Sequence, residues 1–122
     1  MNEMVEPAQV KSILYPVANL AGVASFYEQV FGLSLAFQDG DRYAAFVPAA
    51  GVRLALTAGT ESLVEGIPMM SLLVADLTQS IELAVRCGGS VRIPPQDGPH
   101  ERRAVIDDPS GNPVVVYEKL SL

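Results

Sequence analysis

The sequence predicts an α+β fold built from two βαβββ modules. The main observation is an internal repeat, because the residues Val-Ala-Asn-Leu at 17–20 recur as Val-Ala-Asp-Leu at 74–77, 57 residues further along the chain. Gly32 and Gly89 keep the same offset. In each half, an apolar run of strand length is followed by a helical pattern and then by three more strand-like runs. We therefore expect one supersecondary unit to occur twice in a single domain.

The order of hydrophobic patterns gives the expected boundaries of each module. Module one is expected over about 10–58, a surface crossover over 58–68 and module two over about 69–119, within one domain of residues 1–122. Strands are expected over 12–17, 34–38, 42–47 and 52–57 in module one, and over 69–74, 90–93, 102–106 and 113–119 in module two, with helices over 20–31 and 77–85.

Both predicted helices carry recognisable start and stop signals. Asn19 and Asp76 stand where a side-chain oxygen accepts a hydrogen bond from the first free amides of a helix. Gly32 and the pair Gly88-Gly89 follow the last apolar positions, where a left-handed residue commonly ends a helix.

Composition excludes several classes of protein. The chain has 122 residues, 49% of them hydrophobic, and eight basic against fourteen acidic residues give a net charge of −6. An acidic chain without a basic run repels phosphate backbones, so we expect no nucleic-acid partner. No apolar run reaches the about 18 residues of a membrane span, so we expect no membrane partner. A single cysteine, Cys87, and an acidic N-terminus favour a cytoplasmic protein.

The order and spacing of several short motifs resemble a known family. They are similar to the vicinal oxygen chelate superfamily, which includes glyoxalase I, bleomycin-resistance proteins, extradiol dioxygenases and fosfomycin-resistance enzymes. The resemblance implies curved mixed sheets around a cavity, often completed by dimerisation. It rests on residues 17–20, Phe26-Tyr27, Val-Phe-Gly-Leu at 30–33, residues 74–77, Gly88-Gly89 and Asp-Pro-Ser-Gly-Asn at 108–112.

The resemblance also implies where a metal would be bound. The family's enzymes carry His, Glu or Gln ligands on the first and last strand of each module, and those positions fall here on Ser12, Ala55, Met69 and Val115. Alanine and valine have no donor atom, and serine and methionine are poor ligands for the divalent metals concerned. We therefore expect no metal and no cofactor, and we name no catalytic residue.

The same positions predict a mostly apolar ligand pocket with a few polar groups. Arg53 shares a strand face with Ala55, so it either binds a ligand anion or pairs with a local acid. Arg102 and Arg103 point to opposite faces, and Arg103 is our choice for the cavity side. The predicted ligand-binding residues are Ser12, Leu14, Arg53, Ala55, Met69, Ser71, Arg103, Val115 and Tyr117.

His100, Cys87 and the segment that begins at Asp108 could suggest catalysis, but each has a simpler structural explanation. His100, the only histidine, lies in a polar loop flanked by proline, which favours a solvated side chain over a general base. Cys87 lies near a helix end, where ordinary packing is more common than nucleophilic chemistry. The segment that begins at Asp108 has the composition of a turn rather than of an acid–base pair.

These expectations lead to a metal-independent small-molecule-binding protein, similar to the bleomycin-resistance-like branch, with sequestration of a drug or metabolite as one version. The alternative is a metal-independent lyase or isomerase that uses Tyr117, Arg53 or His100. A third interpretation is a scaffold whose own side chains fill the cavity. The apolar strand faces and the family resemblance predict a homodimer.

Overall fold

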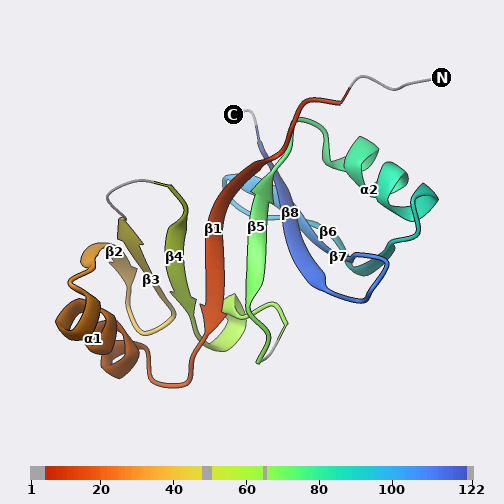
Figure 1. Ribbon diagram of the computed structural model, residues 1–122. Helices are drawn as coiled ribbons and strands as arrows, with labels where there is room; N and C mark the ends of the chain where they lie inside the picture. The colour runs from red at the N-terminus through yellow and green to blue at the C-terminus, as the bar shows by residue number, and fades with distance from the viewer. Residues whose placement is uncertain (1–4, 48–50, 65, 121–122) are drawn as a thin grey trace. The chain divides into compact units, whose positions relative to one another are not determined.

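The computed structural model describes residues 5–47, 51–64 and 66–120 (Figure 1). These residues form two compact units, one of Lys11–Met70 and the other mainly of residues 71–120. The elements are β1 (Gln9–Pro16), α1 (Leu20–Phe31), β2 (Ser34–Asp39), β3 (Tyr43–Val47), β4 (Arg53–Thr57), the short 3-10 helix η1 (Gly59–Glu61), β5 (Met69–Leu73), α2 (Leu77–Arg86), β6 (Ser90–Asp97), β7 (Glu101–Asp107) and β8 (Pro113–Lys119). This order confirms the α+β fold of two βαβββ modules.

In the first unit, four strands form a mixed sheet in the order β2-β3-β4-β1. Strands β2, β3 and β4 are joined by antiparallel pairing, whereas β1 runs parallel to β4. The parallel register places Ser12 opposite Arg53 and Leu14 opposite Ala55. Residues opposite one another in a sheet share a face, so these four side chains lie on the same side.

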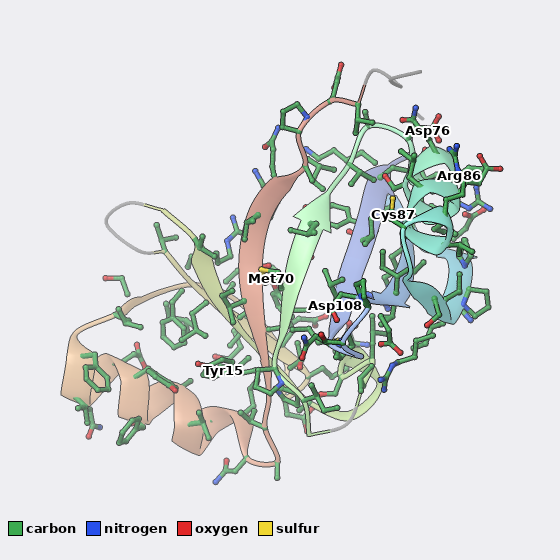
Figure 2. The ribbon with its side chains drawn as sticks, turned by 45° about the vertical axis from the view of Figure 1, so that its right-hand side comes forward. Tyr15, Met70, Asp76, Arg86, Cys87 and Asp108 are labelled. Atoms are coloured by element: carbon green, nitrogen blue, oxygen red, sulfur yellow. The ribbon has the colours of Figure 1, made fainter. Side chains whose placement is uncertain are left out.

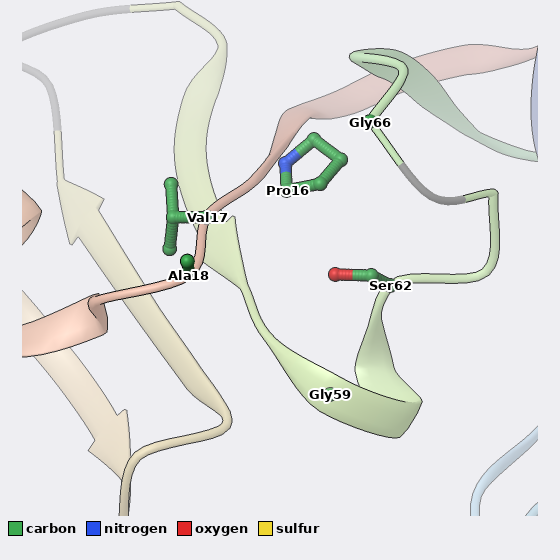
Figure 3. A pocket seen from close by; sticks show the side chains of 6 residues that line it. All are labelled: Pro16, Val17, Ala18, Gly59, Ser62 and Gly66. Carbon is green, nitrogen blue, oxygen red and sulfur yellow. The ribbon is translucent and has the colours of Figure 1, made fainter.

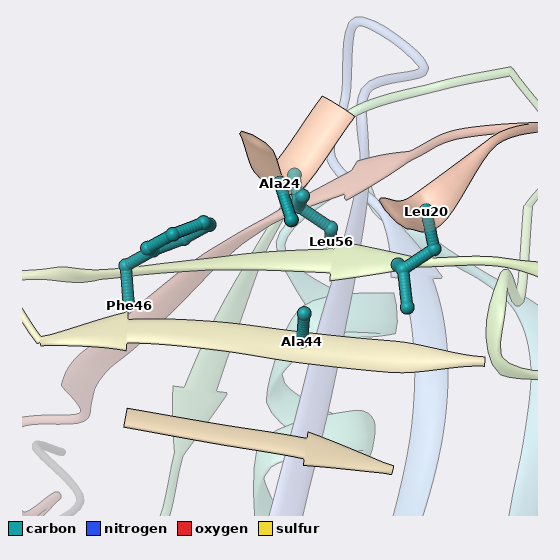
Figure 4. Close-up of a cluster of buried hydrophobic side chains, with 5 residues drawn as sticks. All are labelled: Leu20, Ala24, Ala44, Phe46 and Leu56. Atoms are coloured by element: carbon teal, nitrogen blue, oxygen red, sulfur yellow. The ribbon is translucent and has the colours of Figure 1, made fainter. Parts of the chain in front are cut away.

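Helix α1 covers the other face of this sheet. Figure 4 shows Ala44 and Phe46 pointing from β3 towards the helix, with Leu20 and Ala24 pointing back from α1. Leu56 belongs to the same cluster and is fully buried. Because strand residues alternate between faces, the even positions of β4 face α1 and its odd positions, Arg53 and Ala55 included, face away from it.

The second unit repeats this arrangement with β6-β7-β8-β5 and α2. Its buried cluster joins Leu77 of α2 to Ala104 of β7 and Val116 of β8. The register pairs Ser71 with Val115 in parallel and Arg103 with Tyr117 in antiparallel fashion. These four residues occupy the face away from α2, because their strand neighbours Ala104 and Val116 pack against the helix.

The predicted helix caps are present. Asn19 Oδ1 accepts a hydrogen bond from the Gly22 amide, and Asp76 Oδ1 accepts one from the Gln79 amide, each at 3.0 Å. Gly32 ends α1 in the left-handed conformation at φ 66°. Local chemistry therefore sets the boundaries of both helices as the sequence predicts.

Strand β6 extends beyond its predicted end. Residues 94–97 were expected in a connecting loop, but β6 runs through Pro94 and Pro95 to Asp97. The strand lies at the end of its sheet and its register with β7 is irregular at two places. Proline has no backbone N–H to donate to a neighbouring strand. An edge strand tolerates it at positions that face outward, because no neighbouring strand is present there to accept the hydrogen bond.

The α2–β6 connection depends on a close backbone approach at Gly89. A Cβ atom there would lie 2.7 Å from the Asp107 carbonyl oxygen and 3.1 Å from the Ala84 carbonyl oxygen. Gly88, by contrast, has a φ of 99°. The two adjacent glycines thus serve different purposes, one for conformation and one for space.

Among the residues that the structure describes, no helix is long and apolar enough to span a membrane.

Candidate functional site

The helix-free face of the first sheet carries four of the nine predicted ligand-binding residues. Ser12 and Leu14 lie on β1 beside Arg53 and Ala55 on β4. Ser12 is 8% exposed and Ala55 is fully buried, whereas Arg53 is exposed. These four residues therefore share one face of the sheet, as the sequence predicts, and the charged residue Arg53 is exposed to solvent.

The Arg53 guanidinium has no protein partner in the part of the chain that the structure describes. Other arginines do have acidic partners, for example Arg42 with Asp39, Arg92 with Asp107, and Arg102 with Asp97. An exposed arginine without an acid beside it remains available to a carboxylate or phosphate.

The helix-free face of the second sheet carries four more of the predicted residues. Ser71, Val115, Tyr117 and Arg103 share this face, and Arg103 stands directly opposite Tyr117. The neighbouring Arg102 points to the other face, and its Nε lies 3.5 Å from Asp97 Oδ1. The choice of Arg103 rather than Arg102 for the helix-free face thus agrees with the register.

Met69, the ninth predicted residue, is the first residue of β5 and is buried at 4% exposure.

A separate pocket lies within the first unit, at the carboxyl ends of β1 and β4. Its volume is about 530 Å³, and Figure 3 shows the residues that line it. One wall is the chain that leaves β1 and enters α1, and the other is the segment that follows β4. None of the nine predicted residues lines it. The lining residues are Pro16, Val17, Ala18, Gly59, Ser62 and Gly66.

Two hydrogen bonds stabilise the segments around this pocket, one between the segments and one within the chain that follows β4. The Val17 amide donates to the Thr57 carbonyl oxygen at 2.8 Å, which ties the chain after β1 to the end of β4. The hydroxyl oxygens of Thr57 and Ser62 lie 3.0 Å apart. Thr57 is 3% exposed, so this hydrogen bond joins Ser62 to a buried residue at the end of β4.

The residues that line the pocket are partly apolar and partly polar, and none of them is charged. Pro16, Val17 and Ala18 supply apolar surface, whereas Ser62 supplies a hydroxyl. The two glycines expose backbone without a side chain to cover it. An uncharged pocket of this kind suits the neutral, partly apolar part of a small molecule.

His100 and Cys87, for which the sequence favours structural roles, do not line this pocket. His100 is exposed in a loop, and its carbonyl oxygen accepts a hydrogen bond from the Leu120 amide at 3.0 Å. Cys87 caps the end of α2 and is exposed, so the expectation that it packs in the interior is wrong (Figure 2). A residue that follows the last helical turn no longer lies on the buried stripe of that helix.

Asp108, labelled in Figure 2, precedes the turn between β7 and β8 and has a structural role there. Its carboxylate accepts hydrogen bonds from the amides of Ser110 and Asn112 and from the Asn112 side chain. These bonds, the one from the Asn112 side chain foremost, lower the pKa of Asp108 below its ordinary value. The turn interpretation of this segment agrees with its geometry.

The sequence as a whole matches one family. Residues 9–116 match the model of the Glyoxalase/Bleomycin resistance protein/Dioxygenase superfamily. The chain belongs to this superfamily.

Several known proteins are similar to this chain in sequence or in fold. The chain is similar to an uncharacterized protein of Mycolicibacterium smegmatis, with 34% identity over 112 residues, 92% of this chain and 95% of that protein. A superfamily member from Vibrio splendidus 12B01 has a TM-score of 0.69 at 14% identity and covers 92% of this chain and 99% of its own. Methylmalonyl-CoA epimerase from Mycobacterium tuberculosis has a TM-score of 0.67 at 17% identity, over 97% and 94% of the two chains. At these identities the two solved structures show the shared fold.

The superfamily's implied metal positions can be tested by the chemistry of their side chains. Ala55 and Val115 have no donor atom, and Ser12 and Met69 offer only a hydroxyl and a thioether. Within the described residues, no three His, Cys, Asp or Glu side chains gather in a way that could hold a metal ion. The side chains at these positions do not fit a divalent metal.

The pocket residues that sequence reasoning missed lie after β1 and after β4. Gly59, Ser62 and Gly66 belong to the segment expected only as a surface crossover, and Ala18 was noted only as part of the repeat. One signal was present, since a loop with several glycines after a strand often forms part of a binding site. The sequence does not show that this loop packs beside the β1–α1 connection, because that contact depends on the tertiary fold.

Proposed function

We propose that this superfamily member binds a small organic molecule without a metal ion, sequestering a drug or a metabolite. The observation that carries this proposal is the pocket at the carboxyl ends of β1 and β4, with its volume of about 530 Å³. Small-molecule sites commonly span about 300–1,000 Å³ and combine apolar walls with a few polar groups. The lining from Pro16 to Gly66 has this composition.

The donor set supports the absence of a metal from this function. A metal-dependent reaction needs three or more strong ligands with fixed geometry. Ser12, Ala55, Met69 and Val115 provide none of the imidazole or carboxylate groups required. The proposed protein therefore binds its ligand by shape, apolar contact and hydrogen bonds.

The cell compartment proposed for this function is the cytoplasm. Cys87 is a free, exposed thiol. Exposed unpaired cysteines are best tolerated where the surroundings keep thiols reduced.

One observation favours a second candidate, a metal-independent lyase or isomerase. Tyr117 and Arg103 stand opposite one another on the helix-free face of the second sheet. A tyrosine hydroxyl and an arginine guanidinium on one strand face are groups that acid–base chemistry on a small substrate can use. This candidate makes Tyr117 a reacting group, whereas the binding protein does not need its hydroxyl.

Native mass spectrometry of freshly purified protein, with one pocket variant and one matched control, tests the binding function. Ala18→Phe places a ring in the pocket, because Ala18 lines it. Ala75 is the counterpart of Ala18 in the internal repeat, is also exposed and does not line this pocket, so Ala75→Phe is the control. We expect wild type and Ala75→Phe to retain a small molecule that Ala18→Phe loses.

The same samples separate the two candidate functions. The retained compound is released by denaturation and its chromatographic retention compared between wild type and Tyr117→Phe. A binding protein releases the same compound from both. An enzyme releases substrate from Tyr117→Phe and a converted compound from wild type. A wild-type chain that retains nothing contradicts the binding proposal.

A further inference from the structure

Thr57 and Ser62 form a pair of hydroxyl groups at the pocket, and burial sets the direction of the hydrogen bond between them. Their oxygens lie 3.0 Å apart, and on distance alone either hydroxyl could donate. Neither side chain has another hydrogen-bond partner among the residues that the structure describes. Thr57 is 3% exposed, whereas Ser62 is half-buried and lines the pocket.

The buried member of this pair is the donor. A hydroxyl proton that is removed from water and finds no acceptor destabilises the fold, so a buried hydroxyl group donates wherever an acceptor is in reach. For Thr57 that acceptor is the Ser62 oxygen. Thr57 therefore donates to Ser62, and the Ser62 hydroxyl accepts this bond while its own proton remains free.

The free proton of Ser62 is available to a molecule in the pocket. Figure 3 shows the Ser62 hydroxyl pointing towards Ala18 on the opposite wall. A hydroxyl that accepts one hydrogen bond becomes a stronger donor, because neighbouring bonds in a chain polarise one another. Ser62 thus presents a hydrogen-bond donor to the pocket, and the strength of this donor depends on Thr57.

Two backbone amides add further donors without adding charge. Ala18 and Gly59 line the pocket, and their amides donate to no acceptor within residues 5–47, 51–64 and 66–120. None of the six lining residues is charged, so a ligand cation finds no counter-charge in the pocket wall. The net charge of −6 repels anions. An oxygen atom of a neutral ligand matches these donors best.

We propose that the pocket selects neutral compounds that carry a carbonyl group, whose oxygen accepts a hydrogen bond from the Ser62 hydroxyl. This inference rests on the proposed binding function and names the class of ligand for it. Ser62 contacts the ligand and determines specificity, whereas Thr57 is a positioning residue that acts through Ser62. The apolar surface of Pro16 and Val17 takes the hydrocarbon part of the ligand.

Titration of the full chain at neutral pH with three compounds that share a cyclohexane ring tests this selectivity. Cyclohexanone offers a neutral acceptor, cyclohexylammonium a charged donor and cyclohexanecarboxylate a charged acceptor. Shifts of the Ala18, Gly59 and Ser62 amide signals in NMR spectra locate each probe in the pocket and give its dissociation constant. We expect cyclohexanone to bind wild type most tightly.

Two serine variants assign the selectivity to one hydroxyl. Ser80 is half-buried like Ser62 and does not line the pocket, so Ser80→Ala is the control for Ser62→Ala. Because a hydrogen bond between uncharged groups contributes about fivefold to binding, Ser62→Ala should weaken cyclohexanone binding about fivefold. Its binding of cyclohexylammonium should not change, and Ser80→Ala should bind all three probes like wild type.

Two variants of Thr57 test its action through Ser62. Thr57→Val removes the buried donor and keeps a branched side chain of similar size, whereas Thr57→Ser keeps the hydroxyl. We expect cyclohexanone binding to weaken relative to cyclohexylammonium binding in Thr57→Val and to stay close to wild type in Thr57→Ser. The ratio of the two dissociation constants corrects for a change in pocket shape that affects both probes. These variants also decide the matter should Ser62→Ala fail to fold.

Three results would overturn the proposal: tighter binding of either charged probe than of cyclohexanone, no binding of any probe, or a Ser62→Ala variant that keeps the wild-type preference. Native mass spectrometry of wild type separates such a failure from failure of the proposed function. A chain that retains a small molecule but shows no ketone preference contradicts the ligand class alone. A chain that retains nothing but shows the Ser62-dependent preference supports the ligand class and contradicts sequestration.

Discussion

Asp108 accepts hydrogen bonds from both the backbone amide and the side-chain amide of Asn112, each at 3.0 Å. One carboxylate therefore holds both ends of the turn between β7 and β8. Because these bonds favour the ionised form, the pKa of Asp108 is lower in the folded chain than its ordinary value of 3.8.

This relationship predicts a pH-dependent contribution to stability. A carboxyl group whose folded pKa is lowered stabilises the fold fully above its unfolded pKa and loses that effect as the pH falls through the folded pKa. Asp108→Ala should therefore unfold more easily than wild type at neutral pH, and the difference should shrink below about pH 4.

Denaturant unfolding at several pH values measures this effect. Asp41→Ala serves as the control, because Asp41 is exposed and has no hydrogen-bond partner among the residues that the structure describes. A difference between Asp108→Ala and wild type that grows as the pH falls would contradict the assigned role of the carboxylate.

The backbone approach at Gly89 predicts a costly alanine substitution. The added Cβ atom would lie 2.7 Å from the Asp107 carbonyl oxygen, and both neighbouring groups are backbone atoms that cannot rotate away. We expect Gly89→Ala to lower the free energy of unfolding by about 1–3 kcal/mol.

Thermal unfolding measures that loss, with Gly98→Ala as its control. A Cβ atom at Gly98 would meet the Glu101 carbonyl oxygen at 3.4 Å, an ordinary contact distance. Equal melting temperatures for the two variants would show that the Gly89 connection can relax.

The exposed position of Arg53 predicts a substitution with little effect on folding. Since no ion pair holds its guanidinium among the described residues, Arg53→Ala should change the free energy of unfolding by less than about 0.5 kcal/mol. Because Arg53 does not line the pocket of Pro16 and Gly59, Arg53→Ala should leave binding in that pocket unchanged, and it should weaken binding only of a ligand whose carboxylate or phosphate contacts the helix-free face of the first sheet.

Arg92→Ala is the comparison variant for Arg53→Ala. Arg92 Nε lies 2.8 Å from Asp107 Oδ1, so its loss removes an existing ion pair, worth up to about 1 kcal/mol at a surface. If Arg53→Ala destabilises the ligand-free protein more than Arg92→Ala does, Arg53 serves the structure rather than a ligand.

The parts of the fold that sequence predicted are those that local chemistry determines. The N-caps at Asn19 and Asp76 and the left-handed Gly32 need only their nearest neighbours along the chain. The face of a strand residue follows from alternation, once one neighbour is known to be buried. Which of the two faces Arg103 occupies needs a tertiary contact as well, because the packing of Ala104 against Leu77 places Arg103 on the helix-free side.

The parts that sequence missed depend on tertiary position. Pro94 and Pro95 look like loop residues until β6 is known to be an edge strand. The pocket forms where the β1–α1 connection meets Gly59 and Ser62, segments that lie more than 40 residues apart along the chain. No local sequence pattern predicts that two segments so far apart along the chain lie side by side.

Native mass spectrometry of wild type beside Ala18→Phe tests most directly the claim that the chain binds a small molecule without metal. The account predicts that wild type carries an organic molecule, that Ala18→Phe does not, and that neither carries a stoichiometric metal ion. One Zn, Ni, Fe or Mn ion per chain, a bare wild-type chain, or an organic molecule retained equally by both proteins would contradict it.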